Sequence, residues 1–337
     1  MKNYLLAGIL PALITIGLYS CSKYEPTVET SINQNQSSGS ELKAIPPLGV
    51  LTAFTNVECI SSKNRVHWST DGKNLGSGEV LYDGISSITA MLNYKGMVLT
   101  AFLEAGLDRP SYGIVQSKLG YNSDKRTPVY QGGSPVIAMT EYNGGVLTAF
   151  SNSPLNQNPY RILWSPDGNN LGKGETRYEG DLIVTAMLSY KGGVLTAFAD
   201  PRYNPGRHIV IWSPDGITLD KGEVVYVGVS PVAAMIEYNG GVLTAFSDSR
   251  FNPNQYRVLW SHDGNNLGEG ETRYEGGSPV TALTKYKGGV LTAFSNASLD
   301  PNLHRVHWSP NGMNLGTGDI VYEGCSPVTA MISSIRY

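Results

Sequence analysis

One pattern of hydrophobic and polar positions repeats along most of the chain. An alternating apolar run, a short glycine-containing turn and the phrase Val-Leu-Thr-Ala-Phe recur together. The phrase returns every 48 residues, and it ends at Phe54, Phe102, Phe150, Phe198, Phe246 and Phe294. A period of this length, with several short apolar runs in each unit, indicates either a propeller or a solenoid.

A single unit predicts four β-strands. The glycine pair between the first two apolar runs is a hairpin signal, because glycine supplies the positive φ that tight hairpin turns need. Four antiparallel strands per unit are typical of a propeller blade. In the unit from Ser278 to Tyr322, the predicted strands are Pro279 to Tyr286, Val290 to Ser295, Arg305 to Trp308 and Asp319 to Tyr322.

The repeat also predicts how the ring closes. The first unit starts at its second strand, Gly49 to Phe54, whereas the last unit ends at its first strand, Ser326 to Ile335. Pairing of these two strands would complete a mixed blade, whereas a solenoid would leave its terminal units capped. We therefore expect an all-β domain over residues 48–337: a six-bladed β-propeller of four-stranded antiparallel blades, built from six 48-residue repeats.

Two cysteines fall close to the expected closure. If Tyr286 faces Gly289 across the hairpin, positions 277 and 298 are opposite, and their equivalents in the mixed blade are Cys325 and Glu58. Cys59 is the next residue, and no other unit has a cysteine at either position. We predict a Cys59–Cys325 disulfide that locks the ring. The alternative is a pair of free buried thiols.

The first 47 residues differ in character from the repeats. A charged start and an apolar run from Tyr4 to Leu18 indicate a secretory signal. The run ends in Leu-Tyr-Ser-Cys, which resembles the lipobox of bacterial lipoproteins. The resemblance implies a lipoprotein signal peptide over residues 1–21 whose lipobox cysteine, Cys21, is acylated and becomes the new N-terminus. An ordinary cleaved signal is the alternative. Residues 22–47 are rich in Ser, Asn and Gln and predict a flexible tether.

Charge and export together define the expected surroundings. The formal net charge is −3, and there is no run of Lys or Arg, so we expect no nucleic-acid partner and membrane contact only through the N-terminal lipid. We expect a lipid-anchored protein of the cell envelope, at the outer membrane or the cell surface.

The units resemble the blades of sialidase-type, Asp-box propellers. The resemblance rests on a Pro-containing first strand, a second strand ending in Ala-Phe and a Trp-Ser-x-Asp-Gly turn, as in Trp212 to Gly216. The turn lacks the residue that the family has between Asp and Gly, and the second unit has lost it, with Gln116 and Leu119 at the Trp and Asp positions. In that family the box is a structural turn, so we interpret Asp71, Asp167, Asp215 and Asp263 as turn formers. The repeated tryptophans are expected to pack between blades.

The same resemblance argues against enzymatic activity. A sialidase has its first substrate-binding arginine two residues before the proline of the first strand. That position holds Gly133, Val229, Gly277 and Cys325 here, so a sugar carboxylate would lack its bidentate clamp. We predict no catalytic residues and no enzymatic activity.

A second set of positions is polar in every unit. Two residues beyond each phenylalanine stand acids or amides: Asn56, Glu104, Asn152, Asp200, Asp248 and Asn296. Arginines recur at the start of the third strand, at Arg65, Arg161, Arg257 and Arg305. In the resembled family, this side of the propeller is where ligands bind. The alternative is that these residues only cap turns and solvate a strand edge.

The interpretation that we favour is a lectin-like, carbohydrate-binding or adhesive module with several similar sites, because acids, amides, arginines and nearby aromatic rings such as Tyr160 and Tyr256 suit a sugar. Its partners would be glycans, or a protein of the envelope or of a host surface. One alternative is a protein-interaction scaffold of the envelope, and another is a degenerate sialidase-like glycan hydrolase. We expect no cofactor. A calcium site is the weaker hypothesis, since no dense Asp-x-Asp spacing appears.

Overall fold

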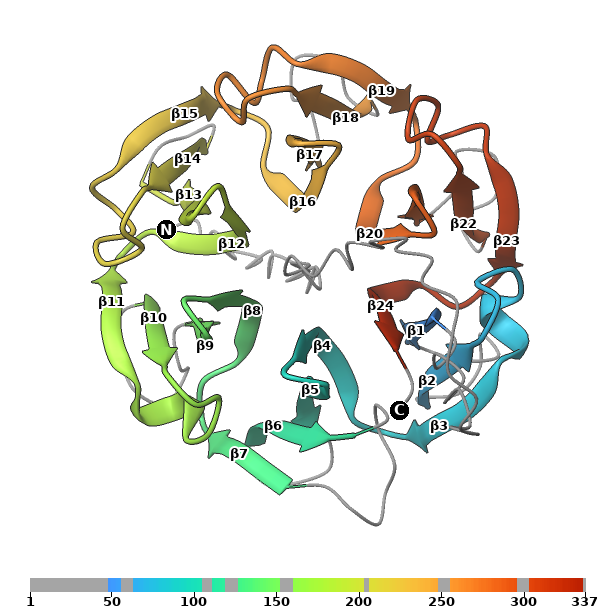
Figure 1. Cartoon of the computed structure of the whole chain (residues 1–337), viewed down its shortest axis with the longest axis horizontal. Coiled ribbons are helices and arrows are strands. Elements are labelled where there is room, and N and C mark those ends of the chain that lie inside the picture. The colour runs from blue at the N-terminus through green and yellow to red at the C-terminus, as the bar shows by residue number, and fades with distance from the viewer. Residues whose placement is uncertain are drawn as a thin grey trace, which may run out of the picture.

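The computed structural model describes residues 48–55, 63–104, 111–118, 127–151, 160–202, 206–247, 255–295 and 303–335. These residues form six four-stranded antiparallel sheets. Figure 1 shows the sheets arranged as a ring around a central axis. The expected six-bladed, all-β propeller is therefore confirmed. Helical structure among the described residues is confined to the short 3₁₀ turns η1 (Leu75–Ser77) and η3 (Leu171–Lys173).

Every blade contributes one strand to each of four concentric positions (Figure 1). The innermost strands are β4 (Ser87–Tyr94), β8 (Val136–Tyr142), β12 (Ile183–Tyr190), β16 (Val232–Tyr238), β20 (Val280–Tyr286) and β24 (Val328–Ile335). The second strands are β1 (Leu48–Phe54), β5 (Met97–Glu104), β9 (Gly145–Phe150), β13 (Gly193–Asp200), β17 (Gly241–Phe246) and β21 (Gly289–Phe294). The third strands are β2 (Asn64–Ser69), β6 (Ser111–Ser117), β10 (Tyr160–Ser165), β14 (Arg207–Ser213), β18 (Tyr256–Ser261) and β22 (His304–Ser309). The outer strands are β3 (Glu79–Gly84), β7 (Thr127–Gly132), β11 (Glu175–Gly180), β15 (Glu223–Gly228), β19 (Glu271–Gly276) and β23 (Asp319–Gly324).

The ring closes through the two ends of the repeat array. Strand β1 pairs antiparallel with β24, with Leu51 opposite Ile332 and Thr52 opposite Met331. The mixed blade therefore has the strand order β24-β1-β2-β3, the same order from the axis outward as the other five. Closure of this kind joins the first and last segments of the domain and leaves no terminal unit exposed.

Because neighbouring strands are antiparallel, the connections fall on two opposite faces. We call the face with the tight turns between innermost and second strands the hairpin face. Asn143 and Gly144 form one such turn with φ of 47° and 69°, the left-handed pair that two-residue hairpins require. We call the opposite face the loop face. It carries the ends of the second strands, the starts of the third strands and the links from each outer strand to the next blade.

A bulge changes one detail of the predicted register. Tyr286 faces Gly289 as expected, but the register shifts by one residue between Val280 and Ala282. The other five pairs of innermost and second strands shift at the equivalent place. The prediction that positions 277 and 298 are opposite assumed an uninterrupted register, and that assumption is wrong. The bulge inserts an unpaired residue that sequence alternation does not reveal.

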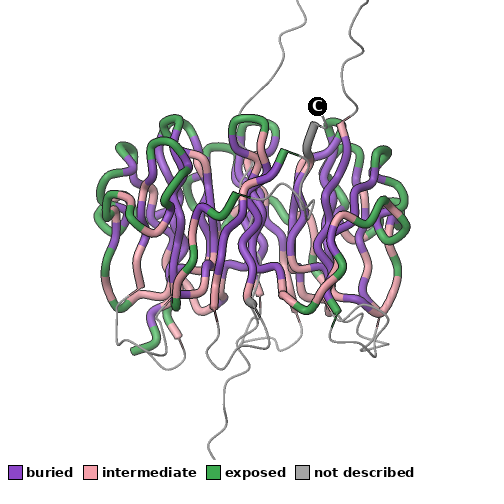
Figure 2. The backbone as a smooth tube through the Cα atoms, turned by 90° about the horizontal axis from the view of Figure 1, so that it is seen from below, coloured by how far each residue is buried: buried purple, intermediate pink, exposed green. Residues whose placement is uncertain are grey.

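The core runs around the ring at mid-height. Figure 2 shows buried residues along the middle of the strands and exposed residues mainly at the turns. The valine, leucine and alanine of the repeated phrase are buried in every blade. Large buried side chains from adjacent blades belong to shared clusters, so the blades stabilise one another by burying apolar surface between them.

Candidate functional site

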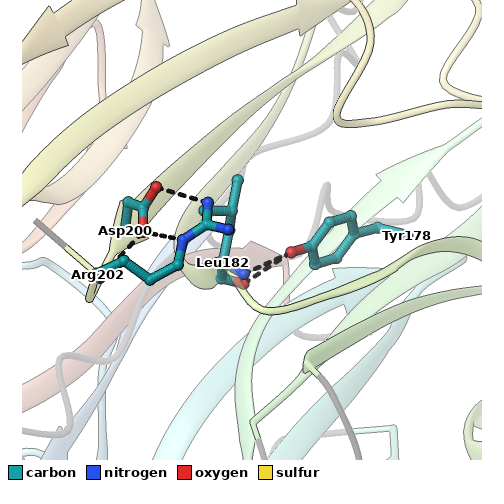
Figure 3. Close-up of polar contacts among 4 residues, drawn as sticks. All are labelled: Tyr178, Leu182, Asp200 and Arg202. Carbon is teal, nitrogen blue, oxygen red and sulfur yellow. Dashed lines mark hydrogen bonds and ion pairs between the residues drawn. The ribbon is translucent and has the colours of Figure 1, made fainter.

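The outer tyrosines fix the links between blades on the loop face. The hydroxyl of Tyr178 donates to the carbonyl of Leu182 at 3.1 Å and accepts from its backbone N–H at 2.8 Å (Figure 3). Burial raises the pKa of Tyr178 to about 12. Four tyrosines at equivalent positions bond the residue four places on in the same manner: Tyr82, Tyr130, Tyr274 and Tyr322. Tyr226 donates to the carbonyl of Ser230 at 2.9 Å.

The same rings connect one blade to the next. Tyr178 packs against Phe198 of the following blade with ring centroids 5.0 Å apart. Tyr274 and Phe294 are 4.7 Å apart, and Tyr322 lies 4.8 Å from Phe54 across the closing interface. Tilted aromatic pairs at these distances add to the energy of area burial. In the described part of the loop face, the links between blades are therefore hydrogen-bonded and the blade interfaces are packed.

Of the six predicted acids and amides, Asp200 is the one whose side chain the structure describes. Asn56, Asn152, Asp248 and Asn296 lie outside the described residues, and Glu104 is described only in its backbone at the end of β5. These five positions stay predictions.

The Asp200 carboxylate is held by Arg202. Its two oxygens lie 2.8 Å from the guanidinium Nε and Nη2, and Oδ1 also accepts from the Arg202 backbone N–H at 3.1 Å (Figure 3). These bonds from Arg202 lower the pKa of Asp200 to about 2. The residue is 4% exposed, whereas the Arg202 side chain is 62% exposed. The acid therefore anchors a cation that faces solvent.

The predicted arginines stand in the third strands, opposite acids of the outer strands. Arg65 Nε donates to Asp83 at 3.0 Å, and Arg305 Nε donates to Glu323 at 2.6 Å. The strand register also places Arg161 opposite Glu179 and Arg257 opposite Glu275. In the blade that contains Asp200, Ile209 takes the arginine position and Arg207 stands opposite Asp200. Charged pairs thus recur around the loop face, in the outer half of each blade that has them.

The Asp-Gly turns lie on the hairpin face, away from this site. Asp215 Oδ1 accepts from the Ile217 backbone N–H at 2.9 Å and lies 3.1 Å from Ser213 Oγ. The backbone bond is the main reason why the pKa of Asp215 is lowered, and Asp71, Asp167 and Asp263 are held in the same way. The interpretation of these residues as turn formers agrees with this geometry.

Trp164, Trp260 and Trp308 each donate an indole hydrogen bond within their own blade, whereas the indole nitrogens of Trp68 and Trp212 are buried without a partner. Trp164 donates from its indole N–H to the carbonyl of Tyr142 in the same blade at 3.0 Å, and Arg177 lies over its ring at 5.0 Å. Trp260 is placed identically by Tyr238 and Arg273. The expectation that they pack chiefly between blades overlooked this contact with the hairpin.

Sequence reasoning missed a buried pair of histidines. His67 and His307 occupy the same position of the repeat, in the two blades on either side of one interface. The other blades have Val115, Leu163, Ile211 and Leu259 there. A signal was present, because a polar residue replaces an aliphatic one in an otherwise apolar column.

The structure bears in part on the predicted disulfide, on membrane contact and on metal binding. Cys325 is disulfide-bonded, and its partner lies outside the described residues, as do Cys59 and Cys21. In the described part of the chain, no helix is long and apolar enough to cross a membrane. No group of three His, Cys, Asp or Glu side chains in that part is arranged to hold a metal ion.

Comparison with known proteins gives similarity in structure only. No protein-family model matches the chain, and no curated protein matches its sequence. An exo-beta-1,3-galactanase from Phanerochaete chrysosporium, solved with galactose, has a TM-score of 0.43 and 10% identity over 70% of this chain, and the match covers 65% of the galactanase chain, just under two thirds. Zg3597, a family 117 glycoside hydrolase from Zobellia galactanivorans, scores 0.41 with 13% identity over 63% of this chain and 79% of its own. The WD40 propeller domain of Doa1 scores 0.43 with 13% identity over 85% and 83% of the two chains.

Proposed function

We propose that this protein is a carbohydrate-binding module with several similar sites on the loop face. The observation that carries the proposal is the recurrence of fixed charged pairs on that face. Arg65 with Asp83, Arg305 with Glu323, and Arg202 with Asp200 are held at 2.6 to 3.0 Å by strand register or by a local turn. Each pair offers hydrogen-bond donors and acceptors side by side.

Such pairs suit sugar hydroxyls. A hydroxyl group both donates and accepts, so it can bridge a guanidinium and a carboxylate that are already in contact. Because the outer tyrosines already hold the links between blades by hydrogen bonds, binding would require little ordering of these links, which favours affinity. The ring repeats the arrangement, and a glycan chain presents repeated units. Weak individual sites would then combine into strong attachment through avidity.

The proposal includes the place of the protein in the cell. An acylated Cys21 and a tether over residues 22–47 would hold the propeller at the surface of the envelope, within reach of glycans. A bond between Cys59 and Cys325 would lock the ring, and the disulfide-bonded state of Cys325 supports it. Disulfides persist in the oxidising compartments that such a protein would occupy.

A glycan array tests the proposal. The full chain would be applied with and without calcium, beside the variants Arg65→Gln, Arg305→Gln and Arg202→Gln. We expect binding to a defined set of glycans, weakened at least several-fold by each substitution. A matched control is Lys73→Gln, which changes a cation on the hairpin face and should leave the signal unchanged. A blank array, or binding that tracks only net charge, would refute the proposal and favour a protein-binding scaffold.

A further inference from the structure

A cavity of about 100 Å³ lies between two blades. Tyr274 of β19 and Ser278 of the following link form one side of it. Phe294, Arg305 and His307 of the β20–β23 blade form the other. It is bounded further by Leu303 and Gly316. The cavity joins aromatic and aliphatic walls to several hydrogen-bonding groups, which is the usual composition of a small-ligand site.

His307 lines this cavity and has a hydrogen-bonding atom that the protein does not use. The residue is only 9% exposed, and its Nδ1 atom is buried without a protein partner. Its ring stands at 76° to Phe294 with the centroids 5.3 Å apart. A buried polar atom without a partner costs free energy. The fold does not need histidine here, because Val115, Leu163, Ile211 and Leu259 fill the same position elsewhere in the ring.

The charges around the cavity are already balanced. Burial, aided by the charge of Arg305, lowers the pKa of His307, so its imidazole is neutral at pH 7. The guanidinium of Arg305 is paired with Glu323 at 2.6 Å. Burial raises the pKa of Tyr274, so its hydroxyl is also neutral at pH 7. A neutral imidazole has one N–H donor and one nitrogen acceptor, which match a group that both accepts and donates.

We propose that this cavity binds the acetamido group of an N-acetylated amino sugar. The carbonyl oxygen and the N–H of the amide would bond the imidazole of His307 and the neighbouring polar groups, and the methyl group would rest against Phe294 and Leu303. A carboxylate would have only acceptors to offer and would meet an arginine that is already neutralised. This inference rests on the proposed function and specifies the class of sugar.

The next blade interface carries the same set of residues. Tyr322 and Ser326 replace Tyr274 and Ser278, while Phe54 and His67 replace Phe294 and His307. The Phe54 and His67 rings are 5.2 Å apart, and both nitrogens of His67 are buried. Arg65 and Gly76 complete the match, with Lys63 in place of Leu303. The equivalence of these residues therefore predicts a second such site at the other interface of the β20–β23 blade.

Saturation-transfer NMR on the full chain tests the inference, with N-acetylglucosamine and glucose as the probes. We expect the strongest saturation at the acetyl methyl protons and little transfer to glucose. The double variant His67→Leu/His307→Leu introduces the residue that two other blades have, and it should raise the dissociation constant for N-acetylglucosamine roughly tenfold or more. The matched control Leu259→Val should bind as the unaltered chain does. Equal saturation of both sugars, or an unchanged double variant, would overturn the inference.

A second readout does not depend on the variants. The imidazole ¹⁵N resonances of His67 and His307 should shift when N-acetylglucosamine is added to the unaltered chain, and not when glucose is added. Binding of the sugar without any such shift would overturn the assignment. The inference alone fails if the array shows glycan binding that is indifferent to acetamido groups. The proposed function fails with it if no glycan binds at all.

Discussion

At the scale of single residues, the hydroxyl of the outer tyrosine holds the link that follows it. Tyr178 donates to and accepts from the backbone of Leu182. Both backbone groups would lose a partner in Tyr178→Phe, so we expect a loss of about 1–3 kcal/mol in the free energy of unfolding. Denaturant unfolding measures this. The control is Tyr160→Phe, because the Tyr160 hydroxyl has no hydrogen-bond partner among the described residues. This variant should change the free energy of unfolding by less than about 0.5 kcal/mol. Equal losses would contradict the role.

The buried histidines make stability depend on pH. Burial lowers the pKa values of His67, His304 and His307 below 6.5 in the folded state. Between the folded and unfolded pKa values, the unfolded chain binds more protons, so stability falls as the pH falls below about 6.5. Each unit of depression removes about 1.4 kcal/mol once the pH is below both values.

Urea unfolding at pH 7.5 and pH 5.5 tests this dependence. We expect a lower free energy of unfolding at pH 5.5. The double variant His67→Leu/His307→Leu should lose less stability over the same interval, because it has fewer histidines to protonate. A pH dependence that is identical in the two proteins would show that groups other than His67 and His307 control the response.

At the scale of elements, the turn between the third and outer strands fastens three of the blades to the preceding one, through Leu219, Leu267 and Leu315. The backbone N–H of Leu267 donates to the carbonyl of Val225 in the preceding blade at 3.0 Å, and Leu315 bonds Arg273 at the same distance. Both leucine side chains are fully buried. The turn is therefore part of the blade interface as well as a connection within its own blade.

Truncation of this leucine should be costly. Leu267→Ala would leave a cavity in the interface, and we expect a loss of about 2–4 kcal/mol in the free energy of unfolding. The matched control is Ile217→Ala, in the turn of the preceding blade, where the side chain is 53% exposed. It should change stability by no more than about 0.5 kcal/mol. Thermal or denaturant unfolding of both variants measures the difference, and a mild effect of Leu267→Ala would mean that the turn does not bind the blades together.

The strands themselves could be predicted from the sequence within one or two residues. The predicted runs Val290 to Ser295 and Arg305 to Trp308 correspond to β21 and β22, which start one residue earlier. These strands have alternating or continuous apolar positions that become buried, so the pattern of hydrophobic residues in the sequence is sufficient to predict them. The bulge in each inner pair escaped prediction, because an extra residue such as Thr281 leaves the local composition unchanged.

The candidate site was less predictable. The repeated positions of Asp200 and of the arginines were visible in the sequence. The bonds that Arg202 donates to Asp200 depend on turn geometry, and the bonds from the other arginines to acids of the outer strands depend on cross-strand register. The cavity at His307 arises where two blades meet. Its lining residues Tyr274 and His307 are more than 30 residues apart in the chain. Packing of that kind has no local signature. The buried histidines were nevertheless visible as exceptions in an apolar column.

At the scale of the whole molecule, closure joins the two ends of the domain. Backbone pairing of β1 with β24 is observed, and we expect a Cys59–Cys325 bond beside it. Loss of a disulfide that closes so long a loop should lower the free energy of unfolding by about 3–5 kcal/mol. Cys59→Ser, Cys325→Ser and the double variant should lose similar amounts if the two residues form one bond. A silent Cys59→Ser would show that Cys325 pairs elsewhere.

The ring also implies that binding sites come in multiples. A single asymmetric patch would be expected of a protein-interaction scaffold, whereas repeated charged pairs predict several equivalent sugar sites. Native mass spectrometry of the full chain counts these sites, with the shortest oligosaccharide that the array retains as the ligand. We predict two or more oligosaccharides bound per chain at saturation. A single bound molecule, or none at millimolar concentration, would contradict a carbohydrate-binding propeller with repeated sites.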